Sequence, residues 1–386
     1  MKVLMLRTNK VDPDPRVEKE ATSLIKNPDI ELSIHAWDRE KNHKCIKENL
    51  NLPTGNVPIY RIGIKGNWGK GMKNNILPAL RYELYLFFWL LFNIKKYDVI
   101  HAFDLMTGYP ALIPAKIFKK KIVYDCCDYY ADSQHGPEFI MRKLRKMETK
   151  VFEKSDYSII CSEKRINQIA PAKPKKLSVI HNSPDIENFK IDETSDNKIC
   201  KSDSKRLKLV YVGNFCHDRW LVELAESVKK LNDKVELHIG GFGGLGEKIE
   251  EISKTTDNIY VYGKMQYGDV LKLEKECDCI VALYETHLKN HIYAAPNKFY
   301  EALAIGKPLL MIKNSGMSEI VEKEKIGVIM DTTFESFSES INKLTELVKD
   351  KKLSKKMNTI FENEYSWKIM ENRLNNIYEE VAKKNI

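Results

Sequence analysis

Two charged residues, Lys298 and Glu301, stand three positions apart in a stretch that has the chemistry of a nucleotide site. The stretch predicts a loop that leaves the carboxyl end of a parallel strand, followed by a short helix with helix-forming residues from Phe299 to Ala304. Free N–H groups and the partial positive charge of such a helix start suit a phosphate. Lys298 adds a full charge there, and the Glu301 carboxylate can accept two hydrogen bonds from a sugar diol. These residues together predict a site for a diphosphate and a ribose.

The elements around this helix must place it at the edge of a sheet. Residues 279–283 and 309–312 are short apolar runs that predict two buried strands. Between them the helix ends at Gly306, and Pro308 prevents its continuation. A plainer interpretation stays open, in which Glu301 complements the helix dipole and Lys298 is a solvated charge.

A second α/β unit begins with the predicted strand 207–213, which is followed by Asn214 and, before the next helix, by Arg219. Further on, Gly241–Gly246 matches G-x-G-x-x-G, the form of a dinucleotide-binding turn. An NAD-dependent oxidoreductase would need an acidic residue at the end of the following strand, 258–263, and none stands there. We therefore assign these glycines to a tight turn near a phosphate or sugar.

In the first half of the chain, predicted strands end in carboxylates. Residues 98–104 form a buried run that ends at Asp104, and residues 121–128 contain Asp125 and Asp128. Active sites of α/β proteins lie at such strand ends, and two carboxylates could serve acid–base chemistry. The alternative is that these residues cap the helices that follow.

Composition narrows the classes of function. The chain has 386 residues, enough for two domains, and a formal charge of +9 that comes from scattered lysines. Basic and aromatic residues do not interleave as in a base-stacking surface, so we expect no nucleic-acid partner. The 8 cysteines include no C-x-x-C pair, so we expect buried free thiols in a reducing cytosol and no metal site. The first residues run straight into a strand and lack the anatomy of a signal peptide.

The most apolar stretch is a predicted helix over residues 81–94, followed by Lys95 and Lys96. It falls short of the roughly 20 residues that span a bilayer. Because it is hydrophobic nearly all round, we favour a helix packed inside its domain. Docking on a membrane surface stays open as the alternative.

The run Pro296-Asn297-Lys298-x-x-Glu301, followed by Ala304-x-Gly306-Lys307-Pro308, resembles the donor-binding motif of family 4 glycosyltransferases of the GT-B fold. In that family the residue at the position of Glu301 binds the donor ribose. Many members have another glutamate eight residues earlier, where this chain has Tyr293. The chain looks like the branch that carries Pro-x-Lys-x-x-Glu instead.

The resemblance extends over nearly the whole chain. Residues 14–21 resemble the family's first loop and helix and place Arg16 near an acceptor, although Arg16 could simply pair with Glu20 one turn on. The family's two diphosphate-binding cations correspond to Asn214 and Arg219. The resemblance and the residue chemistry together give catalytic candidates Lys298, Arg219, Asp104 and Asp128; donor-binding candidates Gly213, Asn214, Gly241, Gly243, Gly263, Lys264, Met265, Tyr293, Pro296, Asn297 and Glu301; and acceptor-side candidates Arg16 and His101.

The alternation of strands and helices predicts two Rossmann-like parallel-sheet domains facing a cleft. We expect an N-terminal domain over 1–190, a linker over 191–206, a donor domain over 207–365 and a last helix over 366–386 that packs on the first domain.

By resemblance, the protein is a retaining, metal-independent glycosyltransferase without a cofactor. It would use a UDP- or GDP-sugar as the donor and a hydroxyl group as the acceptor, and one alternative is that the acceptor is lipid-linked. The product would belong to the synthesis of a surface polysaccharide or glycolipid in the cytoplasm. The protein's localisation would be cytoplasmic, with peripheral contact to the inner face of the membrane as an open question. The alternatives are a nucleotide-sugar epimerase or hydrolase of the same fold and, further off, an NAD-dependent oxidoreductase.

Overall fold

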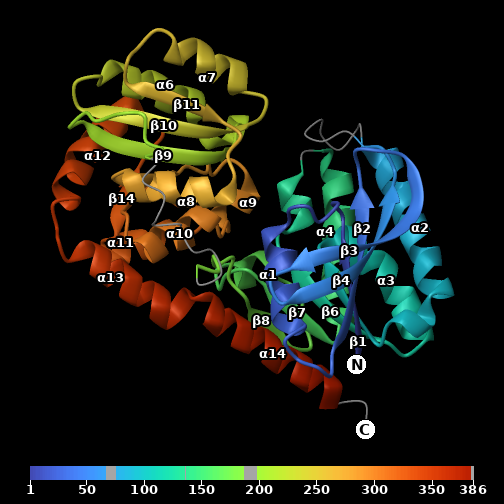
Figure 1. Ribbon diagram of the computed structural model, residues 1–386. Coiled ribbons are helices and arrows are strands. Elements are labelled where there is room, and N and C mark those ends of the chain that lie inside the picture. Colours follow the sequence, from blue (N-terminus) through green and yellow to red (C-terminus); the bar gives the residue numbers. More distant parts are fainter. Residues whose placement is uncertain (67–74, 135, 187–197, 384–386) are drawn as a thin grey trace. The chain divides into compact units, whose positions relative to one another are not determined.

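The computed structural model describes residues 1–66, 75–134, 136–186 and 198–383 (Figure 1). The chain divides into two compact units. The first unit contains Met1–His181 and Met370–Ile386, and the second contains Asn182–Ile369. The two units are described separately below.

The first unit is built on a sheet of eight strands in the order β3-β4-β2-β1-β5-β6-β7-β8. Only β3 runs antiparallel to its neighbour among these strands. The strands are β1 (Lys2–Arg7), β2 (Glu31–Asp38), β3 (His43–Leu52), β4 (Gly55–Gly63), β5 (Val99–Phe103), β6 (Lys121–Cys126), β7 (Tyr157–Ile160) and β8 (Leu177–Val179).

Helices cover both faces of this sheet. They are α1 (Pro15–Leu24), α2 (Ile76–Phe92), α3 (Leu105–Ile117), α4 (Glu138–Lys154), α5 (Arg165–Ile169) and α14 (Trp367–Lys383), with short 3₁₀ turns at Ile94–Lys96 and Tyr130–Ser133. Alternate residues of the strands point to opposite faces. Leu4, Ile100 and Tyr124 therefore pack with the buried side chains of α2, α3 and α4. On the other face, His101 meets Tyr378 of α14.

The second unit has a sheet of six strands in the order β11-β10-β9-β12-β13-β14, and all its pairs are parallel. The strands are β9 (Leu207–Asn214), β10 (Val235–Phe242), β11 (Ile259–Gly263), β12 (Cys279–Ala282), β13 (Leu309–Ile312) and β14 (Gly327–Met330). The helices are α6 (Leu221–Lys230), α7 (Gly246–Ser253), α8 (Tyr267–Glu276), α9 (Lys289–Ile292), α10 (Asn297–Ile305), α11 (Ser318–Glu324), α12 (Phe334–Leu347) and α13 (Leu353–Ile360), with a 3₁₀ turn at His217–Arg219 and a π turn at Phe361–Tyr365.

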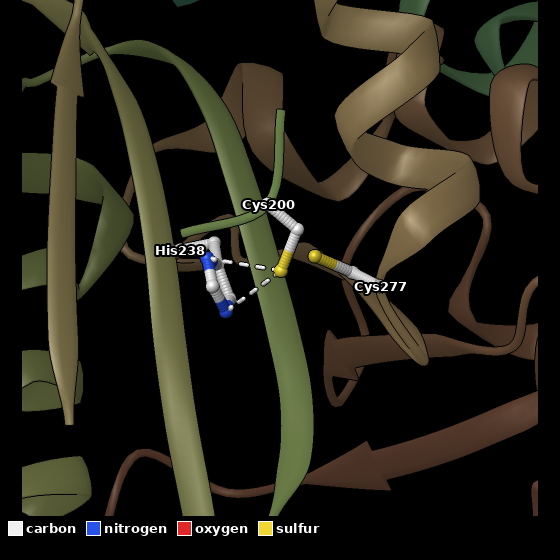
Figure 2. Close-up of side chains that lie close together, drawn as sticks. All are labelled: Cys200, His238 and Cys277. Atoms are coloured by element: carbon white, nitrogen blue, oxygen red, sulfur yellow. Dashed lines mark hydrogen bonds between the residues drawn. The ribbon is translucent and has the colours of Figure 1, made fainter. Parts of the chain in front are cut away.

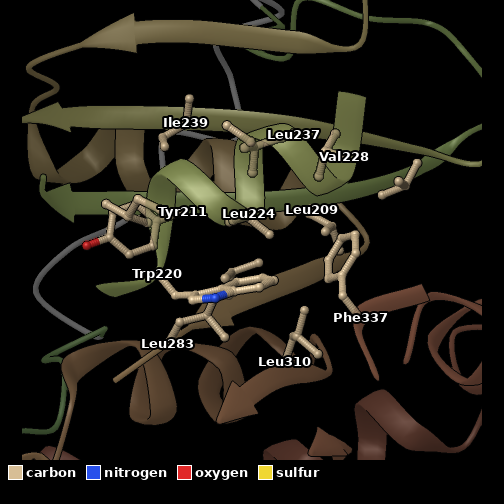
Figure 3. Close-up of a cluster of buried hydrophobic side chains, with 14 of the residues drawn as sticks. Leu209, Tyr211, Trp220, Leu224, Val228, Leu237, Ile239, Leu283, Leu310 and Phe337 are labelled. Carbon is tan, nitrogen blue, oxygen red and sulfur yellow. The ribbon is translucent and has the colours of Figure 1, made fainter. Parts of the chain in front are cut away.

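One hydrophobic core of the second unit lies between its sheet and the helices α6, α7 and α12 (Figure 3). Leu209 and Tyr211 of β9 point into it, as do Leu237 of β10 and Phe337 of α12. The residues of β9 between them face the other side, where α8 and α10 pack. Apolar side chains on both faces are the pattern of a parallel sheet covered by helices.

Helix α2 differs from the prediction that it packs inside its domain. Its buried side chains form one stripe, Tyr82, Leu86, Trp89 and Leu90, whereas Leu84 and Phe92 are 60% and 82% exposed. The helix is apolar on both sides, but only one side is buried. The expectation of a core helix is therefore wrong for half of its surface.

The structure also locates the segments that connect the expected domains. Residues 187–197 of the region between them lie outside the described residues. Within the expected linker, Cys200 and Ser202 are buried in the second unit, and the backbone N–H groups of Ile199 and Cys200 donate to Glu276. In the last helix, residues from Met370 on belong to the first unit.

None of the described helices has the length and apolar character to cross a membrane.

Candidate functional site

The order of strands in the second sheet reverses beside β9, which lies between β10 and β12. In an open parallel sheet the loops that leave the carboxyl ends of such strands diverge, and the crevice between them is where ligands bind. Strand β9 ends at Asn214, and β12 ends at Ala282 and leads through α9 to α10. The predicted residues at the start of α10 therefore belong to the switch point of this sheet.

Helix α10 ends before Gly306 as its sequence predicts, and it begins at Asn297, two residues before the helix-forming run from Phe299. Pro296, with an extended backbone, precedes the first helical residue Asn297. At the other end Gly306 adopts a φ of 70°, which glycine reaches without a steric penalty. The first amides of this nine-residue helix have no partners within the helix. They give its amino end the donors that an anion needs.

Lys298 brings a positive charge to the end of β9. Its Nζ atom donates a hydrogen bond to the carbonyl oxygen of Val212 and stands over the ring of Tyr211, 4.6 Å from its centroid. A Cβ atom added to Gly213 would lie 3.1 Å from this Nζ. Glycine at this strand end thus leaves open the space next to the ammonium group.

Glu301 lies one turn further along α10 and is 5% exposed. Tyr267, the first residue of α8, donates a hydrogen bond from its hydroxyl to Glu301 Oε1 over 2.9 Å. Glu274 of the same helix is buried beside this pair, and its Oε2 has no hydrogen-bond partner among the described residues. Burial and the charge of Glu301 raise the pKa of Glu274 well above its usual value, although Lys298 opposes the shift. Both influences favour the neutral form of the Glu274 carboxyl beside Glu301.

The glycine-rich segment at the end of β10 packs directly on the end of β9. Gly241 has a φ of 137°, and a Cβ atom there would lie 1.8 Å from the carbonyl oxygen of Gly213. Gly243 has a φ of 146°, and its Cβ atom would lie 2.5 Å from the carbonyl oxygen of Phe215. The backbone N–H of Phe215 donates to the carbonyl of Phe242 over 2.8 Å. These two glycines are needed so that the two strand-end turns can touch.

Arg219 stacks its guanidinium group on Tyr284, with 3.4 Å between Cζ and the ring centroid. Its buried Nη1 has no hydrogen-bond partner within the part of the chain that the structure describes. Burial tends to lower the pKa of Arg219, but Tyr284, Tyr211 and Cys216 outweigh it and the pKa rises. The side chain therefore keeps its charge and has a donor that a ligand could satisfy.

The other predicted donor residues lie on neighbouring strand ends of the same unit. Met265 covers Gly240, where a Cβ atom would come within 2.7 Å of the Met265 sulfur. Lys264 Nζ lies 5.7 Å from the centroid of the Phe242 ring. Gly263 has a φ of 65° at the end of β11, and Tyr293 is half-buried just after α9. Asn214 and Asn297 are exposed.

In the first unit, Asp104 belongs to a polar cluster at the switch point between β1 and β5. Arg7, the last residue of β1, bonds to Asp104 over 2.8 Å and to Asp14 over 2.7 Å. Asp104 also accepts hydrogen bonds from the backbone N–H groups of Cys127 and Asp128. Burial raises the pKa of Asp104 to about 6, against the attraction of Arg7. Sequence reasoning missed Arg7, although a cation that ends the first strand was visible in the sequence.

The remaining carboxylate candidate, Asp128, lies at the surface. Its side chain is 61% exposed, and Arg165 binds its Oδ1 over 2.9 Å. Asp104 and Asp128 are therefore joined through the Asp128 backbone, while their carboxylates have different arginine partners.

The acceptor-side candidates Arg16 and His101 are buried together. Arg16 holds both oxygens of Asp125 and also reaches Glu20 over 3.2 Å. His101 Nδ1 hydrogen-bonds the hydroxyl of Tyr378 over 2.8 Å. Burial and the charge of Asp125 raise the pKa of Glu20 well above its usual value, whereas Arg16 holds the pKa of Asp125 low despite its burial. This network ties α1 and α14 to the sheet.

Two groups of side chains among the described residues have the atoms to hold a metal ion. Cys200, His238 and Cys277 come together from distant parts of the sequence, with ligand atoms within 4.8 Å of one another (Figure 2). Both nitrogens of His238 already have partners, Tyr262 at 2.7 Å and Glu236 at 3.0 Å. A metal would have to displace one of them.

The second group is Glu20, His101 and Asp125, where the guanidinium of Arg16 occupies both Asp125 oxygens. Neither group includes Lys298, Glu301 or a glycine of the strand-end turns.

Comparison with known proteins finds a family similarity in the second half of the chain. Residues 192–363 match the family model described as glycosyl transferases group 1. No curated protein matches the sequence.

Several solved structures share the whole fold. Sucrose-phosphate synthase from Thermosynechococcus elongatus aligns with a TM-score of 0.73 at 11% identity and 100% coverage of both chains. The catalytic domain of starch synthase IV from Arabidopsis thaliana, bound to ADP and acarbose, aligns at 0.69 with 12% identity and 99% coverage of each chain. Anabaena HepE in complex with UDP-glucose aligns at 0.67 with 12% identity, over 98% of this chain and 100% of that one.

These likenesses confirm the predicted fold, two parallel-sheet α/β domains of the GT-B type. Membership of family 4 and the role of the Pro-x-Lys-x-x-Glu motif stay predictions. The match of residues 192–363 to the glycosyl transferases group 1 model supports the predicted enzyme class, a glycosyltransferase.

Proposed function

We propose that this protein moves a sugar from a nucleoside diphosphate to a hydroxyl acceptor, with the donor bound where β9 and β12 end. The observation that carries this proposal is the joint position of Lys298 and Glu301 at the amino end of α10, next to the glycine turn of β9. The chain brings a cation, open amides and a buried carboxylate to one switch point. A diphosphate joined to a ribose needs these three partners.

Each residue has a role that follows from its contacts. The Glu301 carboxylate, oriented by Tyr267, accepts hydrogen bonds from the ribose hydroxyls. Lys298 and the first amides of α10 bind the diphosphate, and Arg219 supplies a second charge. Since the leaving group is a diphosphate, the main catalytic demand is to stabilise the negative charge that develops on it. Lys298 and Arg219 are the groups we assign to this task.

The reaction we propose retains the configuration of the sugar. The bond between the anomeric carbon and the diphosphate oxygen breaks, and a bond to the acceptor oxygen forms on the same face. The acceptor's proton passes to the departing diphosphate oxygen, so that the protein need not supply a strong base. No metal or other cofactor takes part in this scheme, and we expect a chelator such as EDTA to leave the rate unchanged.

The donor and acceptor are proposed by class. The similar structure of HepE contains UDP-glucose and that of starch synthase IV contains ADP, which supports a panel of UDP-, GDP- and ADP-sugars as the first donors to try. We propose a lipid-linked hydroxyl acceptor at the inner face of the membrane, in the synthesis of a surface polysaccharide or glycolipid. Peripheral contact with the membrane belongs to this proposal.

The test is donor turnover by the purified protein. Release of the nucleoside diphosphate from each donor is measured with and without sugar and lipid-linked alcohol acceptors. We expect one donor to be used and the rate to rise with an acceptor. Release that no acceptor accelerates would favour the alternative of a nucleotide-sugar hydrolase.

Two variants and two controls localise the activity. Glu301→Gln keeps the side-chain volume but weakens ribose binding by about 1–3 kcal/mol, a change of about 5- to 150-fold in donor affinity. Lys298→Met should lower turnover as well as affinity. Glu322→Gln and Lys323→Met change surface residues of α11 in the same unit and should behave like the wild type. Equal donor kinetics in Glu301→Gln and Glu322→Gln would remove Glu301 from the site.

A further inference from the structure

Helix α2 exposes a row of large apolar side chains that neither the core nor the donor site uses. The row follows the helical period and consists of Leu77, Leu80, Leu84, Phe88 and Phe92, which are 50–82% exposed. Scattered exposed leucines are normal on a protein surface, but a continuous apolar row marks a contact site.

Helix α3 extends this apolar surface. Ile113 and Ile117 are 57% and 59% exposed, and Phe118 follows them. Helices α2 and α3 pack against each other (Figure 1). Each of them leads into a strand of the same parallel sheet, β5 after α2 and β6 after α3, so they run in the same direction. Phe92 and Ile117 therefore lie at the same edge of the unit, where the strands begin.

A cavity rich in lysines adjoins the apolar surface. It has a volume of about 660 Å³, and its lining includes Ile113 and Ile117 of α3 together with residues of α4. Seven of its 13 lining residues are lysines, and Asp156 is the only acidic one. A cavity with this lining would attract an anion and place apolar side chains next to the bound anion.

Most of this positive charge is not neutralised. Asp156 already bonds to Lys121 over 3.6 Å and to Lys175 over 3.7 Å. Lys116, Lys119, Lys150 and Lys154 also line the cavity and have no ion pair with any residue that the structure describes. Long lysine side chains can lay their methylene groups on an apolar surface while the ammonium groups reach for anions.

We propose that this face of the first unit, formed by α2, α3 and α4, docks on an anionic lipid bilayer. The lysine cavity takes the phosphate of a lipid headgroup, and the apolar row of α2 with Ile113 and Ile117 enters the boundary between headgroups and acyl chains. An amphipathic surface with lysines along its border has the chemistry that such a boundary requires. The inference deepens the membrane contact proposed above and needs no part of the donor site.

Charge complementarity favours a lipid surface over a second copy of this chain. In a symmetric dimer the same face of two copies would meet, which brings two lysine cavities of like charge into one interface. A bilayer that contains phosphatidylglycerol offers negative charge and apolar depth together. The lysine cavity, Phe92 and Ile117 lie toward the strand-start edge of the first sheet, whereas Asp104 follows the end of β5 at the opposite edge.

The test is sedimentation of the full-length protein with vesicles. Vesicles of phosphatidylcholine alone are compared with vesicles that also contain phosphatidylglycerol, at low and high salt. We expect binding to the anionic vesicles that weakens with salt. Equal binding to both vesicle types, or none to either, would overturn the proposal.

A charge variant and its matched control locate the contact. Replacing Lys116, Lys119, Lys150 and Lys154 together with glutamine should weaken vesicle binding at least about tenfold, since each lysine near an anionic surface contributes. The control replaces Lys248, Lys343, Lys351 and Lys355, four exposed lysines of the second unit, and changes the net charge equally. An equal loss of vesicle binding in the two variants would show a general effect of net charge and would contradict the assignment of the contact to the lysine cavity.

The apolar part is tested with Phe88→Ser and Ile117→Ser, which remove exposed side chains. Both should lower vesicle binding and leave the thermal midpoint and nucleotide binding unchanged. Concentration-dependent dimerisation that these changes abolish, without vesicle binding, would assign the face to a second copy. Stabilisation by inorganic phosphate without vesicle binding would assign the cavity to a soluble anion. Either result overturns the membrane proposal and leaves the donor site untouched.

Discussion

Gly241→Ala should damage the second unit far more than Gly244→Ala, three residues further along the same turn. The alanine Cβ at position 241 would lie 1.8 Å from the carbonyl oxygen of Gly213, at a φ of 137°. At Gly244 no atom lies within 4 Å of the added Cβ. The two changes add the same methyl group to neighbouring glycines, so that their difference measures the contact between the two turns.

The magnitude follows from two costs. A residue other than glycine at such a φ costs about 1–3 kcal/mol, and overpacking against backbone costs about 1–3 kcal/mol more. The sum is at least about 2 kcal/mol. For a unit of this size 1 kcal/mol lowers the thermal midpoint by about 2–4 °C. We expect a fall of at least about 4 °C for Gly241→Ala and almost none for Gly244→Ala.

The assay is thermal unfolding followed by circular dichroism, together with nucleotide titration at a temperature where both variants are folded. Gly241→Ala should also weaken nucleotide binding, because the turn carries the backbone of Gly213 next to Lys298. Equal midpoints and equal affinities in the two variants would refute the assignment of Gly241 to a required close approach.

Two further predictions concern buried groups. Burial raises the pKa of Glu148 to about 8 from a usual 4.5, so the folded protein keeps a proton that the unfolded chain releases, and stability falls as pH rises between these values. Glu148→Gln should reduce the fall of the unfolding free energy with pH by about 1.4 kcal/mol per pH unit, as measured by urea unfolding at several pH values. An unchanged pH dependence would contradict the raised pKa of Glu148. Tyr267→Phe removes the hydroxyl that orients Glu301 and should weaken nucleotide binding by about 0.5–1.5 kcal/mol in a calorimetric titration, whereas equal affinity would show that the bond has no such role.

The sequence was sufficient to predict α10 and its neighbours. Apolar runs on either side, Pro296 before the helix and Gly306 after it, are local signals, and the structure has the helix at Asn297–Ile305. The glycines at 241 and 243 were assigned to a tight turn, and their φ values and contacts show why only glycine fits there.

Contacts between distant segments were beyond local reasoning. In the sequence Glu274 is one of several charged residues of an amphipathic helix, and nothing local indicates that it is buried. The packing of α8 beside α10 brings it next to Glu301. Arg16 and His101 stay acceptor-side predictions, and local reasoning did not show that the packing of α1 and α14 buries them in one network. Helix α2 was misjudged because hydrophobicity on all sides does not tell which side the sheet covers.

The central claim is that the donor nucleotide binds at the amino end of α10. A crystal structure with the nucleoside diphosphate that the protein releases tests it most directly. We predict the ribose hydroxyls within hydrogen-bond distance of the Glu301 carboxylate and the diphosphate within reach of Lys298 Nζ. A nucleotide bound elsewhere, with neither residue in contact, would contradict the account.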